Sequence, residues 1–442
     1  MSQPSLPGQK TLAKMALLFG SVQIATVGAG IIRNKVAAMT VGAAGVGVMA
    51  LFLTITALVA NFASMGVINS GTQAMAKAYG TGDESTIRST IAKLRMWEIV
   101  SGTIAFLIIA LASPLICRVY FGGWTENILS VLTLSLAPAF SIVSGIEQAI
   151  LKGLQRNRML SYSILINALT TILVAVPLYI VWGYDVIALI LTLSMLGMAL
   201  TSSYFGHKAN NAKPDLSVFA FHRHSWSCFT MLWKTMQPLV ALGGAFIVSA
   251  LCASGSELLL QSYFSTISTF AIVGLYKAGY QMSITYPSLI FTAVENDFFP
   301  RLSAISDDVK ARNALVTRQI RVLLLIATPL ILVFILLLPW IIPLMLSNEF
   351  DEIVPMVRIG ALAIIARCVA LPINYLPLAL NRPRDFILVD IVSYTGLVVC
   401  VIAGCHVSNL VGVGGGILAS VIFDAVFAYV FCRVRYGFRF HM

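Results

Sequence analysis

Several charged side chains stand inside or at the ends of long apolar stretches of the sequence. The basic members of this set are Arg33, Lys35, Lys277, Arg358 and Arg367. A charge inside a lipid bilayer is costly, so it persists mainly where it faces an aqueous cavity or a charged partner. Cations in a cavity of low dielectric attract an anion strongly, and the planar guanidinium of arginine meets a phosphate through two hydrogen bonds. The pattern predicts an anion-binding site, which we assign to Arg33, Lys35, Lys277 and Arg367.

Some of these cations also have a simpler interpretation. Arg33, Lys35 and Arg358 stand near the ends of their apolar stretches, so their charged groups could extend into the lipid headgroups instead. Lys277 is expected two to three turns inside its span, too deep for its ammonium group to reach the headgroups easily. Its position therefore favours a side chain that faces a cavity.

Acidic residues also lie within or at the ends of apolar stretches. They are Glu98, Glu147, Glu295, Asp297, Asp390 and Asp424. Most stand close to basic loops and are expected to pair locally, as Glu147 would with Lys152. Glu295 and Asp424 lie deeper and are the candidates for carrying a coupling proton or ion. Asp390 or Asp424 could instead form a structural ion pair with Arg367.

No motif in the chain indicates catalysis. There is no Walker motif, and the glycine run 412–416 precedes no Lys-Ser/Thr pair, so close helix packing explains it better than phosphate binding. His222 and His224 form a pair without a third metal ligand nearby. The loops are too short to hold an enzyme domain. We therefore expect no enzyme activity, catalytic residue, metal or cofactor.

Composition defines the fold class. The 442 residues are 58% hydrophobic and 11% charged, with a mean hydropathy of +0.89, whereas soluble domains carry about 25% charged residues. The apolar runs are continuous and long enough to cross a bilayer as helices, which argues against an alternating β-barrel pattern. The sequence predicts an all-α integral membrane protein. Its net charge of +11 indicates no nucleic-acid partner, because the basic residues sit in short connections between the runs.

Twelve spans are predicted from the apolar runs. They cover residues 12–33, 44–68, 96–117, 127–150, 161–182, 186–207, 235–256, 268–295, 322–345, 354–378, 386–405 and 412–432. With the N-terminus inside, 23 of the 29 Lys and Arg residues fall in or beside cytoplasmic segments. Since positive charge concentrates on the cytoplasmic side, both termini are expected in the cytoplasm.

The two halves of the sequence repeat. The segment Leu154–Arg158, between the fourth and fifth spans, matches Leu380–Arg384, between the tenth and eleventh. Six spans per repeat is an even number, so the halves should be related by an axis along the membrane normal. We expect an N-terminal six-helix lobe over residues 1–207, a cytoplasmic linker over 208–234 and a C-terminal six-helix lobe over 235–442.

Four segments resemble one family of bacterial transporters. Arg33-Asn34-Lys35-Val36-Ala37 with the glycine-rich stretch 41–52, and INSGTQAMAKAYGTGDE at 68–84, resemble the opening of bacterial polysaccharide flippases, the second of them in the loop after span two. VGLYKAGYQ and FFPRLS resemble the eighth span of the same family and the loop after it. The chain thus looks like a Wzx-type O-antigen flippase of the multidrug/oligosaccharidyl-lipid/polysaccharide exporter superfamily.

This resemblance implies a MATE-like, V-shaped fold whose first, second, seventh and eighth spans line a central cavity. It implies that an undecaprenyl-diphosphate-linked oligosaccharide moves from the cytoplasmic to the periplasmic leaflet of the bacterial inner membrane. Membrane lipid, a polysaccharide polymerase and a chain-length regulator are the partners that it suggests.

Three other functions compete with this interpretation. A drug/cation antiporter of the same superfamily would need acids in its first lobe, whereas the first span carries Arg33 and Lys35. A polysaccharide polymerase or ligase would need a large periplasmic loop, and the outer loops here are short. A channel would not need two repeated halves joined by a linker.

Overall fold

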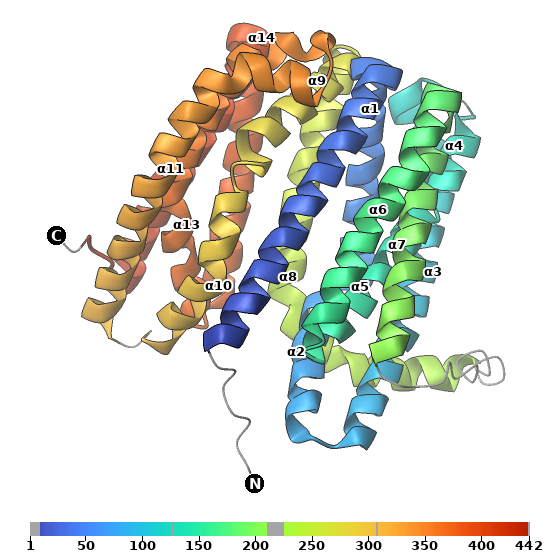
Figure 1. The fold of residues 1–442 in the computed structure, drawn as a ribbon, viewed down its shortest axis with the longest axis vertical. Helices are drawn as coiled ribbons and strands as arrows, with labels where there is room; N and C mark the ends of the chain where they lie inside the picture. The colour runs from blue at the N-terminus through green and yellow to red at the C-terminus, as the bar shows by residue number, and fades with distance from the viewer. Residues whose placement is uncertain (1–8, 126, 210–224, 306–307, 441–442) are drawn as a thin grey trace. The chain divides into compact units, whose positions relative to one another are not determined.

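The computed structural model describes residues 9–125, 127–209, 225–305 and 308–440, and this part of the chain is helical without strands (Figure 1). It forms two compact units. The first unit contains the described residues up to Thr40 together with Ile55–Ile247. The second contains Val41–Thr54 together with the described residues from Val248 onward. The lobe boundaries expected at residues 207 and 235 stay a prediction.

The first unit is built from α1, which it shares with the second unit, and from the helices that follow it. Their bounds are α1 Gln9–Ser64, α2 Val67–Thr81, α3 Glu84–Phe121, α4 Ile128–Leu134, α5 Ala137–Gly153, α6 Asn157–Trp182, the 3-10 turn η1 Gly183–Val186, and α7 Ile187–Ala209. Asp83 begins α3 as its N-cap, because its carboxylate accepts hydrogen bonds from the backbone N–H groups of Ser85 and Thr86. Helices α5, α6 and α7 pack together (Figure 1).

The second unit begins within α8, Ser225–Ile267, which both units share. The remaining elements are α9 Phe270–Tyr280, the π-helical segment η3 Gln281–Thr285, α10 Leu289–Ala304, α11 Val309–Met345, the 3-10 turn η4 Asn348–Ile353, α12 Val354–Ala361, α13 Ala363–Ala379 and α14 Pro383–Tyr436. Asp308 caps α11 as Asp83 caps α3, accepting from the N–H groups of Lys310 and Ala311. Helices α13 and α14 pack against each other.

Each unit has its own apolar core. Met75, Leu94 and Ile146, on α2, α3 and α5, are fully buried in the first unit. Phe264 and Tyr276, on α8 and α9, are equally buried in the second, with ring centroids 4.7 Å apart. Burial in both units therefore comes from side chains that turn inward between neighbouring helices.

The number of membrane-crossing helices agrees with the sequence. Among the described residues, six helical stretches are long and apolar enough to cross a membrane, or seven if the bent pair 348–361 and 363–379 forms one span. Two of them, 157–209 and 383–436, contain 53 and 54 residues, and a straight helix of that length would measure about 80 Å against a hydrocarbon core of about 30 Å. Each therefore contains two spans, which meet at η1 and at the non-helical residues Ser408 and Asn409. With α1 divided at Gly42, and with α8 and the α9–α10 pair included, the described part of the chain has a helical segment at each of the twelve expected spans.

The repeated loops adopt the same backbone conformation. Gln155 and Asn381 occupy equivalent positions in the two matching segments, and both have positive φ, 56° and 53°. In both loops the N–H of the next residue donates to the carbonyl five positions earlier. Arg156 donates to Leu151 at 3.0 Å, and Arg382 donates to Pro377 at 2.8 Å. This is the hydrogen-bond pattern that ends a helix in a left-handed turn. The local repeat predicted from the sequence is confirmed in the backbone.

Two glycines explain why residues 41–54 belong to the second unit. A Cβ atom on Gly47 would lie 2.0 Å from the carbonyl oxygen of Phe270, and one on Gly274 would lie 2.0 Å from that of Ala43. These helices therefore touch backbone to backbone, a separation that side chains would prevent. Gly42, with φ of 62°, provides the break that lets α1 change direction before this contact.

The glycine run at the start of the last span packs helices closely, as predicted. A Cβ atom on Gly414 would lie 2.3 Å from the carbonyl oxygen of Met356, on α12. One on Gly416 would lie 2.4 Å from the carbonyl oxygen of Cys400, in the first half of α14. The run allows the second half of α14 to approach both segments.

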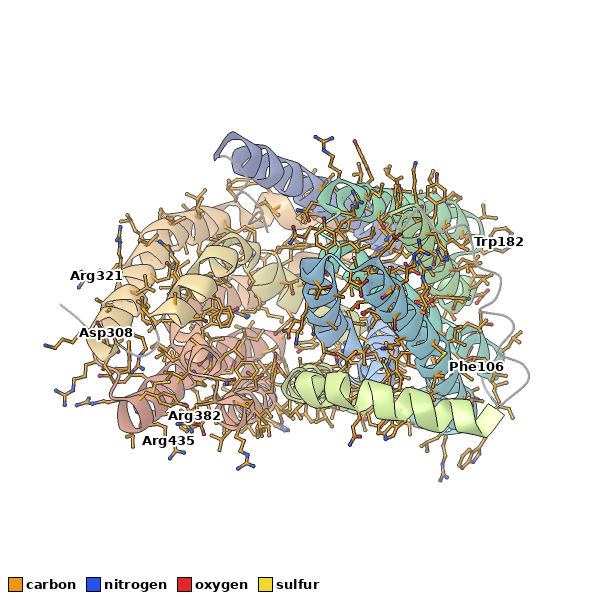
Figure 2. The ribbon with its side chains drawn as sticks, turned by 90° about the horizontal axis from the view of Figure 1, so that it is seen from below. Phe106, Trp182, Asp308, Arg321, Arg382 and Arg435 are labelled. Atoms are coloured by element: carbon orange, nitrogen blue, oxygen red, sulfur yellow. The ribbon has the colours of Figure 1, made fainter. Side chains whose placement is uncertain are left out.

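Basic side chains gather where the start of α11 and both ends of α14 meet. Arg312 donates to the carbonyl of Tyr436 at 2.7 Å, and the Tyr436 hydroxyl donates to Asp385 at 2.6 Å. Arg382 and Arg435 project outward here (Figure 2). We call this region the basic end of the second unit; its basic residues are Lys310, Arg312, Arg318, Arg321, Arg382, Arg384, Arg433 and Arg435. Farther along α11 the exposed side chains are apolar instead; the Leu325 side chain, for example, is 79% exposed.

Candidate functional site

The first unit contains a cavity of about 380 Å³ among α1, α5, α6 and α7. The residues that line it are Thr26, Ala29, Gly30, Arg33, Gln148, Ile164, Asn167, Ala168, Thr171 and Met198. Its volume lies in the ~300–1,000 Å³ range of pockets that hold small organic ligands. Of these lining residues, Arg33 carries a positive charge and none carries a negative one.

Helical periodicity places Arg33 on the cavity wall. Thr26, Ala29, Gly30 and Arg33 follow the i, i+3, i+4, i+7 spacing that brings side chains to one face of a helix. The lining residues of α6 have the same spacing and are Ile164, Asn167, Ala168 and Thr171. Gly30 and the two alanines contribute almost no side-chain volume, which leaves space in front of the guanidinium.

Arg33 is positioned in the cavity with part of its hydrogen-bonding capacity unused. Its Nη2 donates to Oδ1 of Asn34 at 3.3 Å, while its buried Nε has no hydrogen-bond partner in the described part of the chain. On the facing wall Asn167 Nδ2 donates to Ser202 Oγ at 3.1 Å, and the buried Asn167 Oδ1 has no partner among the described residues. Because buried polar groups normally find partners, a cavity with an unused donor and acceptor suits a polar ligand.

Arg33 and Lys35 lie within a continuous helix. The sequence placed both residues at the end of the first span, and α1 continues past them without interruption to Gly42. Lys35 is half-buried and does not line the cavity. Arg358, at the end of α12, is exposed, as a side chain that extends toward headgroups must be.

Lys277 lies in the second unit, where it forms an ion pair with Glu257 of α8. The same carboxylate oxygen, Glu257 Oε1, accepts a hydrogen bond from Gln261 Nε2 at 3.1 Å. Gln261 also donates to the hydroxyl of Thr54 at 2.9 Å, which extends the network to α1. Lys277 stands two turns after the start of α9 at Phe270.

Glu257 is a functional candidate that sequence reasoning missed. The seventh span was expected to end at residue 256, whereas α8 continues to Ile267. This extension brings Glu257 inside the helix, about 15 Å before its end at 1.5 Å per residue. A charge just after an apolar run, followed by the further apolar run LLLQSYF, was the signal that a longer helix would have explained.

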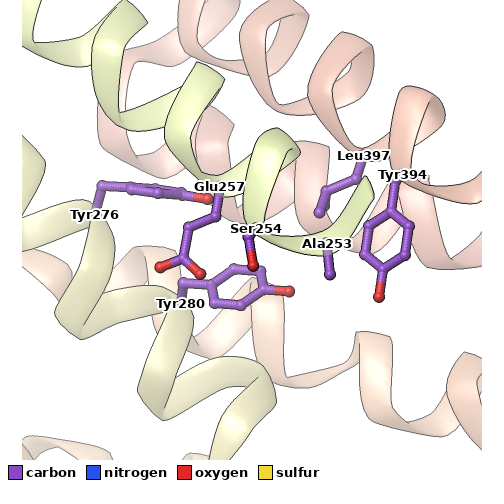
Figure 3. Close-up of a pocket in the computed structure, with 7 residues that line it drawn as sticks. All are labelled: Ala253, Ser254, Glu257, Tyr276, Tyr280, Tyr394 and Leu397. Atoms are coloured by element: carbon purple, nitrogen blue, oxygen red, sulfur yellow. The ribbon is translucent and has the colours of Figure 1, made fainter. Parts of the chain in front are cut away.

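A small pocket adjoins the Lys277–Glu257 pair. Its volume is about 160 Å³, and it is lined by Ala253, Ser254, Glu257, Tyr276, Tyr280, Tyr394 and Leu397. Figure 3 shows the Glu257 carboxylate between Tyr276 and Tyr280, with Tyr394 approaching from α14 on the opposite side. We call it the tyrosine pocket. No cation predicted for the site lines it directly.

Arg367 belongs to α13, and its positive charge acts on Tyr280 and Tyr394 of the tyrosine pocket and on Asp424. Asp424 in turn accepts hydrogen bonds from Asn374 Nδ2 at 3.1 Å and from the hydroxyl of Ser393. Asp424, one of the two acids that the sequence predicted as an ion-pair partner of Arg367, therefore interacts with it electrostatically.

The remaining predicted residues are placed as follows. Glu295 belongs to α10, but its side chain lies outside the described residues, as does that of Asp297. His222 and His224 also fall outside the described residues. Arg33 and Lys277 belong to different units, so the shared site expected for them stays a prediction.

Glu147 has a different partner from the one expected. Arg95 Nε donates to its Oε1 at 2.7 Å, whereas the sequence suggested Lys152. The Glu147 side chain is fully buried, and a Cβ atom on Gly206 would lie 1.8 Å from its Oε2. Arg95 on α3 and Gly206 on α7 thus enclose the carboxylate, which makes this ion pair a structural one.

Comparison with known proteins places the chain in a family. Residues 41–355 match the model of a family described as "Polysaccharide biosynthesis protein". No curated protein matches the sequence.

Solved structures identify the fold. An inward-facing multidrug resistance MATE family transporter of the MOP superfamily aligns with a TM-score of 0.75 at 14% identity, covering 92% of this chain and 93% of its own. The outward-facing conformation of such a MATE family transporter gives a TM-score of 0.65 at 14% identity, covering 96% and 95%. A MOP superfamily transporter from Pyrococcus furiosus Vc1 (DSM3638), described by the reverse polarity of its binding pocket, gives 0.62 at 12% identity over 96% and 95%. At these identities the similarity establishes the fold alone, and that fold is the MATE-like transporter fold predicted from the sequence.

Proposed function

Because the chain belongs to the polysaccharide biosynthesis protein family, we propose that it is a flippase for a lipid-linked oligosaccharide. The cargo would be an O-antigen or related surface polysaccharide repeat unit on undecaprenyl diphosphate. The protein would move it from the cytoplasmic to the periplasmic leaflet of the bacterial inner membrane by alternating access. A polysaccharide polymerase and a chain-length regulator would act on the delivered cargo.

The observation that carries this proposal is the position of Arg33. Its guanidinium lines a cavity of about 380 Å³ whose other lining residues are uncharged, and its buried Nε has no partner among the described residues. A phosphate oxygen would accept from that donor and balance the buried charge. An anionic cargo fits this site, whereas a cationic drug would be repelled.

The remaining predicted site residues have roles within this proposal. Lys277 would contact the same diphosphate by leaving Glu257, while Lys35 and Arg367 would add positive potential along the route. Asp424, which already accepts hydrogen bonds from Asn374 and Ser393, would carry the coupling proton or ion, with Glu295 as a second candidate.

Topology follows from the distribution of charge. The basic end of the second unit would face the cytoplasm, because positive charge is retained on that side of the membrane. The C-terminus, at the end of α14, would then also be cytoplasmic. An even number of spans would place the N-terminus on the same side.

Two other functions are less consistent with the site. A drug/cation antiporter of the same fold would require an acid where Arg33 lines the cavity. A polymerase or ligase would require catalytic residues on an extramembrane loop, whereas the described connections between membrane-length helices are short. In the Pyrococcus furiosus transporter, the reversed polarity of the binding pocket suggests a different function. The cationic cavity of this chain likewise favours a cargo other than a cationic drug.

Surface display of polysaccharide tests the proposal. In a strain of the source bacterium that lacks the gene, Arg33→Ala should restore display poorly and Arg33→Lys partly, while Arg358→Ala should match the wild type. Display is normalised to the amount of each variant in the membrane. Full display by Arg33→Ala at normal abundance would remove the cationic cavity from the transport route. Unchanged display in the deletion strain itself would reject the proposed function.

A further inference from the structure

The tyrosine pocket is distinct from the cavity around Arg33. It lies within the second unit and is formed by α8, α9 and α14. At about 160 Å³ it is smaller than the ~300–1,000 Å³ pockets that enclose drug-sized ligands. Its size therefore suits a single ring of a larger cargo rather than a whole oligosaccharide.

The lining of the pocket combines ring faces with polar tips. Tyr276, Tyr280 and Tyr394 each present an apolar ring and a hydroxyl that can donate or accept a hydrogen bond. A sugar ring has the complementary surface, because its C–H groups form an apolar face and its hydroxyls surround the edge. Leu397 and Ala253 add apolar contact area.

Glu257 supplies a hydrogen-bond acceptor at the pocket wall. Its Oε1 accepts hydrogen bonds from Lys277 and Gln261, whereas its Oε2 accepts none from the described part of the chain. A carboxylate oxygen accepts from a hydroxyl strongly, because bonds to charged groups are stronger than bonds between neutral ones. One sugar hydroxyl could therefore bind Oε2, whether Lys277 stays on Oε1 or leaves it for the diphosphate.

Charge distinguishes a sugar from the other ligand that such a pocket could hold. Aromatic rings beside a carboxylate also attract organic cations. Here Lys277 neutralises Glu257, and the positive charge of Arg367 acts on both Tyr280 and Tyr394. The pocket thus has no excess negative charge to hold a cation. A neutral, hydroxyl-bearing ring fits better, with an anionic group close to the two basic residues.

We propose that the tyrosine pocket binds one neutral sugar ring of the lipid-linked oligosaccharide, packed against Tyr280 and Tyr394 and hydrogen-bonded to Glu257. The proposal rests on the proposed flippase function and adds to it a subsite for the sugar. The second unit would then recognise the sugar nearest the diphosphate, since Lys277 bonds Glu257 of this pocket and the charge of Arg367 acts on two of its tyrosines.

Binding of paired probes to the purified full-length protein tests this subsite. The sugar-free probe is farnesyl diphosphate. The glycosylated probes are farnesyl diphosphates that each carry one glucose, galactose, N-acetylglucosamine or N-acetylgalactosamine. The wild type should bind at least one glycosylated probe more tightly than farnesyl diphosphate. Tyr394→Ala should weaken binding of that probe by about two- to tenfold, the range measured for aromatic contacts, and leave farnesyl diphosphate binding unchanged.

Matched variants separate the subsite from general damage. Tyr394→Phe retains the ring and should lose less affinity for the sugar than Tyr394→Ala. Tyr263→Ala removes a tyrosine of the same unit that bonds His406 outside the pocket, and it should preserve the preference for the glycosylated probe. Tyr280→Ala should reproduce Tyr394→Ala if it folds with an unchanged unfolding temperature; if it does not fold, the Tyr394 variants decide.

The outcomes are distinguishable. No preference for any sugar in the wild type, or equal loss of both kinds of probe in Tyr394→Ala, would overturn the subsite while leaving the flippase proposal intact. Loss of tetraphenylphosphonium binding in Tyr394→Ala with an unchanged sugar preference would identify a cation pocket instead. Failure of the wild type to bind any diphosphate probe would contradict the flippase function itself, and the subsite with it.

Discussion

Lys277 of α9 and Glu257 of α8 form an ion pair in the second unit, and neither side chain is fully enclosed. The two side chains are 26% and 29% exposed. A pair in such a position is worth less than a buried one, because solvent weakens the attraction between the charges. Lys277 can therefore leave Glu257 for a stronger anion, which a diphosphate would provide.

Binding of farnesyl diphosphate to variants of this pair tests the exchange. Lys277→Ala should weaken binding by about one to two orders of magnitude, since a charge-assisted contact contributes about 1.5–3 kcal/mol. Glu257→Gln should strengthen binding, because Lys277 no longer has to leave a charged partner. Weaker binding in Glu257→Gln would show that the carboxylate positions Lys277 rather than competing for it. In the double variant Lys277→Ala/Glu257→Gln, the gain in affinity from Glu257→Gln should disappear, because both substitutions act on the same ion pair.

The buried pair in the first unit should behave differently. Glu147 is fully buried and Arg95 is 12% exposed, so removal of either partner leaves a buried charge unpaired, at about 3–5 kcal/mol. Arg95→Ala should therefore lower the unfolding temperature of the purified protein and its abundance in the membrane. Arg88→Ala is the control, because its ion pair with Glu84 is exposed on both sides.

A second variant acts on the same carboxylate. Gly206→Ala would place a Cβ atom 1.8 Å from Glu147 Oε2, so the carboxylate must move from the position in which Arg95 binds it. It should reproduce the stability loss of Arg95→Ala. Normal stability in both variants would mean that the pair is not structural.

Features encoded within one segment could be predicted from the sequence. Helix length follows from the apolar runs, and a repeated turn follows from a repeated motif, as Gln155 and Asn381 show with φ of 56° and 53°. The position of Lys277 two turns after the start of α9 is also local information, because it depends only on where its own helix begins. The membrane fold follows from such local information together with the short connections between helices.

Partners of charged residues could not be predicted in the same way. The ion-pair partners Lys277 and Glu257 are separated by 20 positions in the sequence, and Arg95 and Glu147 by 52. Which helices are neighbours decides these pairs, and periodicity within one helix does not contain that information. Glu257 was missed for a related reason, since its charge was taken as the end of a span although the Lys277 ammonium compensates it.

The cavity around Arg33 was only partly predictable. The spacing of Thr26, Gly30 and Arg33 on one helical face is visible in the sequence. The opposite walls come from α5, α6 and α7, more than 100 residues later in the chain. The presence of a basic residue in a span predicted an anion site, but not which helices would complete it.

Asp83 gives a prediction about pH. Hydrogen bonds from the hydroxyls of Thr86 and Ser85, with one from the Ser85 N–H, lower the pKa of this exposed carboxyl to about 2. A lowered folded-state pKa stabilises the protein above the ordinary value of 3.8, and the effect is lost as pH falls toward 2. Asp83→Ala should therefore lower the unfolding temperature equally at pH 5 and pH 8. Asp83→Asn should lower it less, because its side-chain oxygen still caps α3. If Asp83→Ala and the wild type unfold at the same temperature at pH 5, the Asp83 carboxyl does not have the lowered pKa described here.

The contact between Gly47 and α9 gives the last prediction. Gly47→Ala would place a Cβ atom 2.0 Å from the carbonyl oxygen of Phe270 and 2.9 Å from the backbone nitrogen of Gly274. Backbone atoms cannot rotate away as a flexible side chain can, so the two helices must separate and residues 41–54 must lose their packing in the second unit. Gly28→Ala is the matched control in the same helix, because a Cβ atom there meets nothing within 4 Å, and alanine is the better helix former by about 1 kcal/mol. Thermal unfolding of the purified variants measures the effect. Gly47→Ala should unfold at a lower temperature than the wild type, and Gly28→Ala at an equal or higher one. Equal stability of both variants would mean that the close contact of these helices is not needed to hold 41–54 in the second unit.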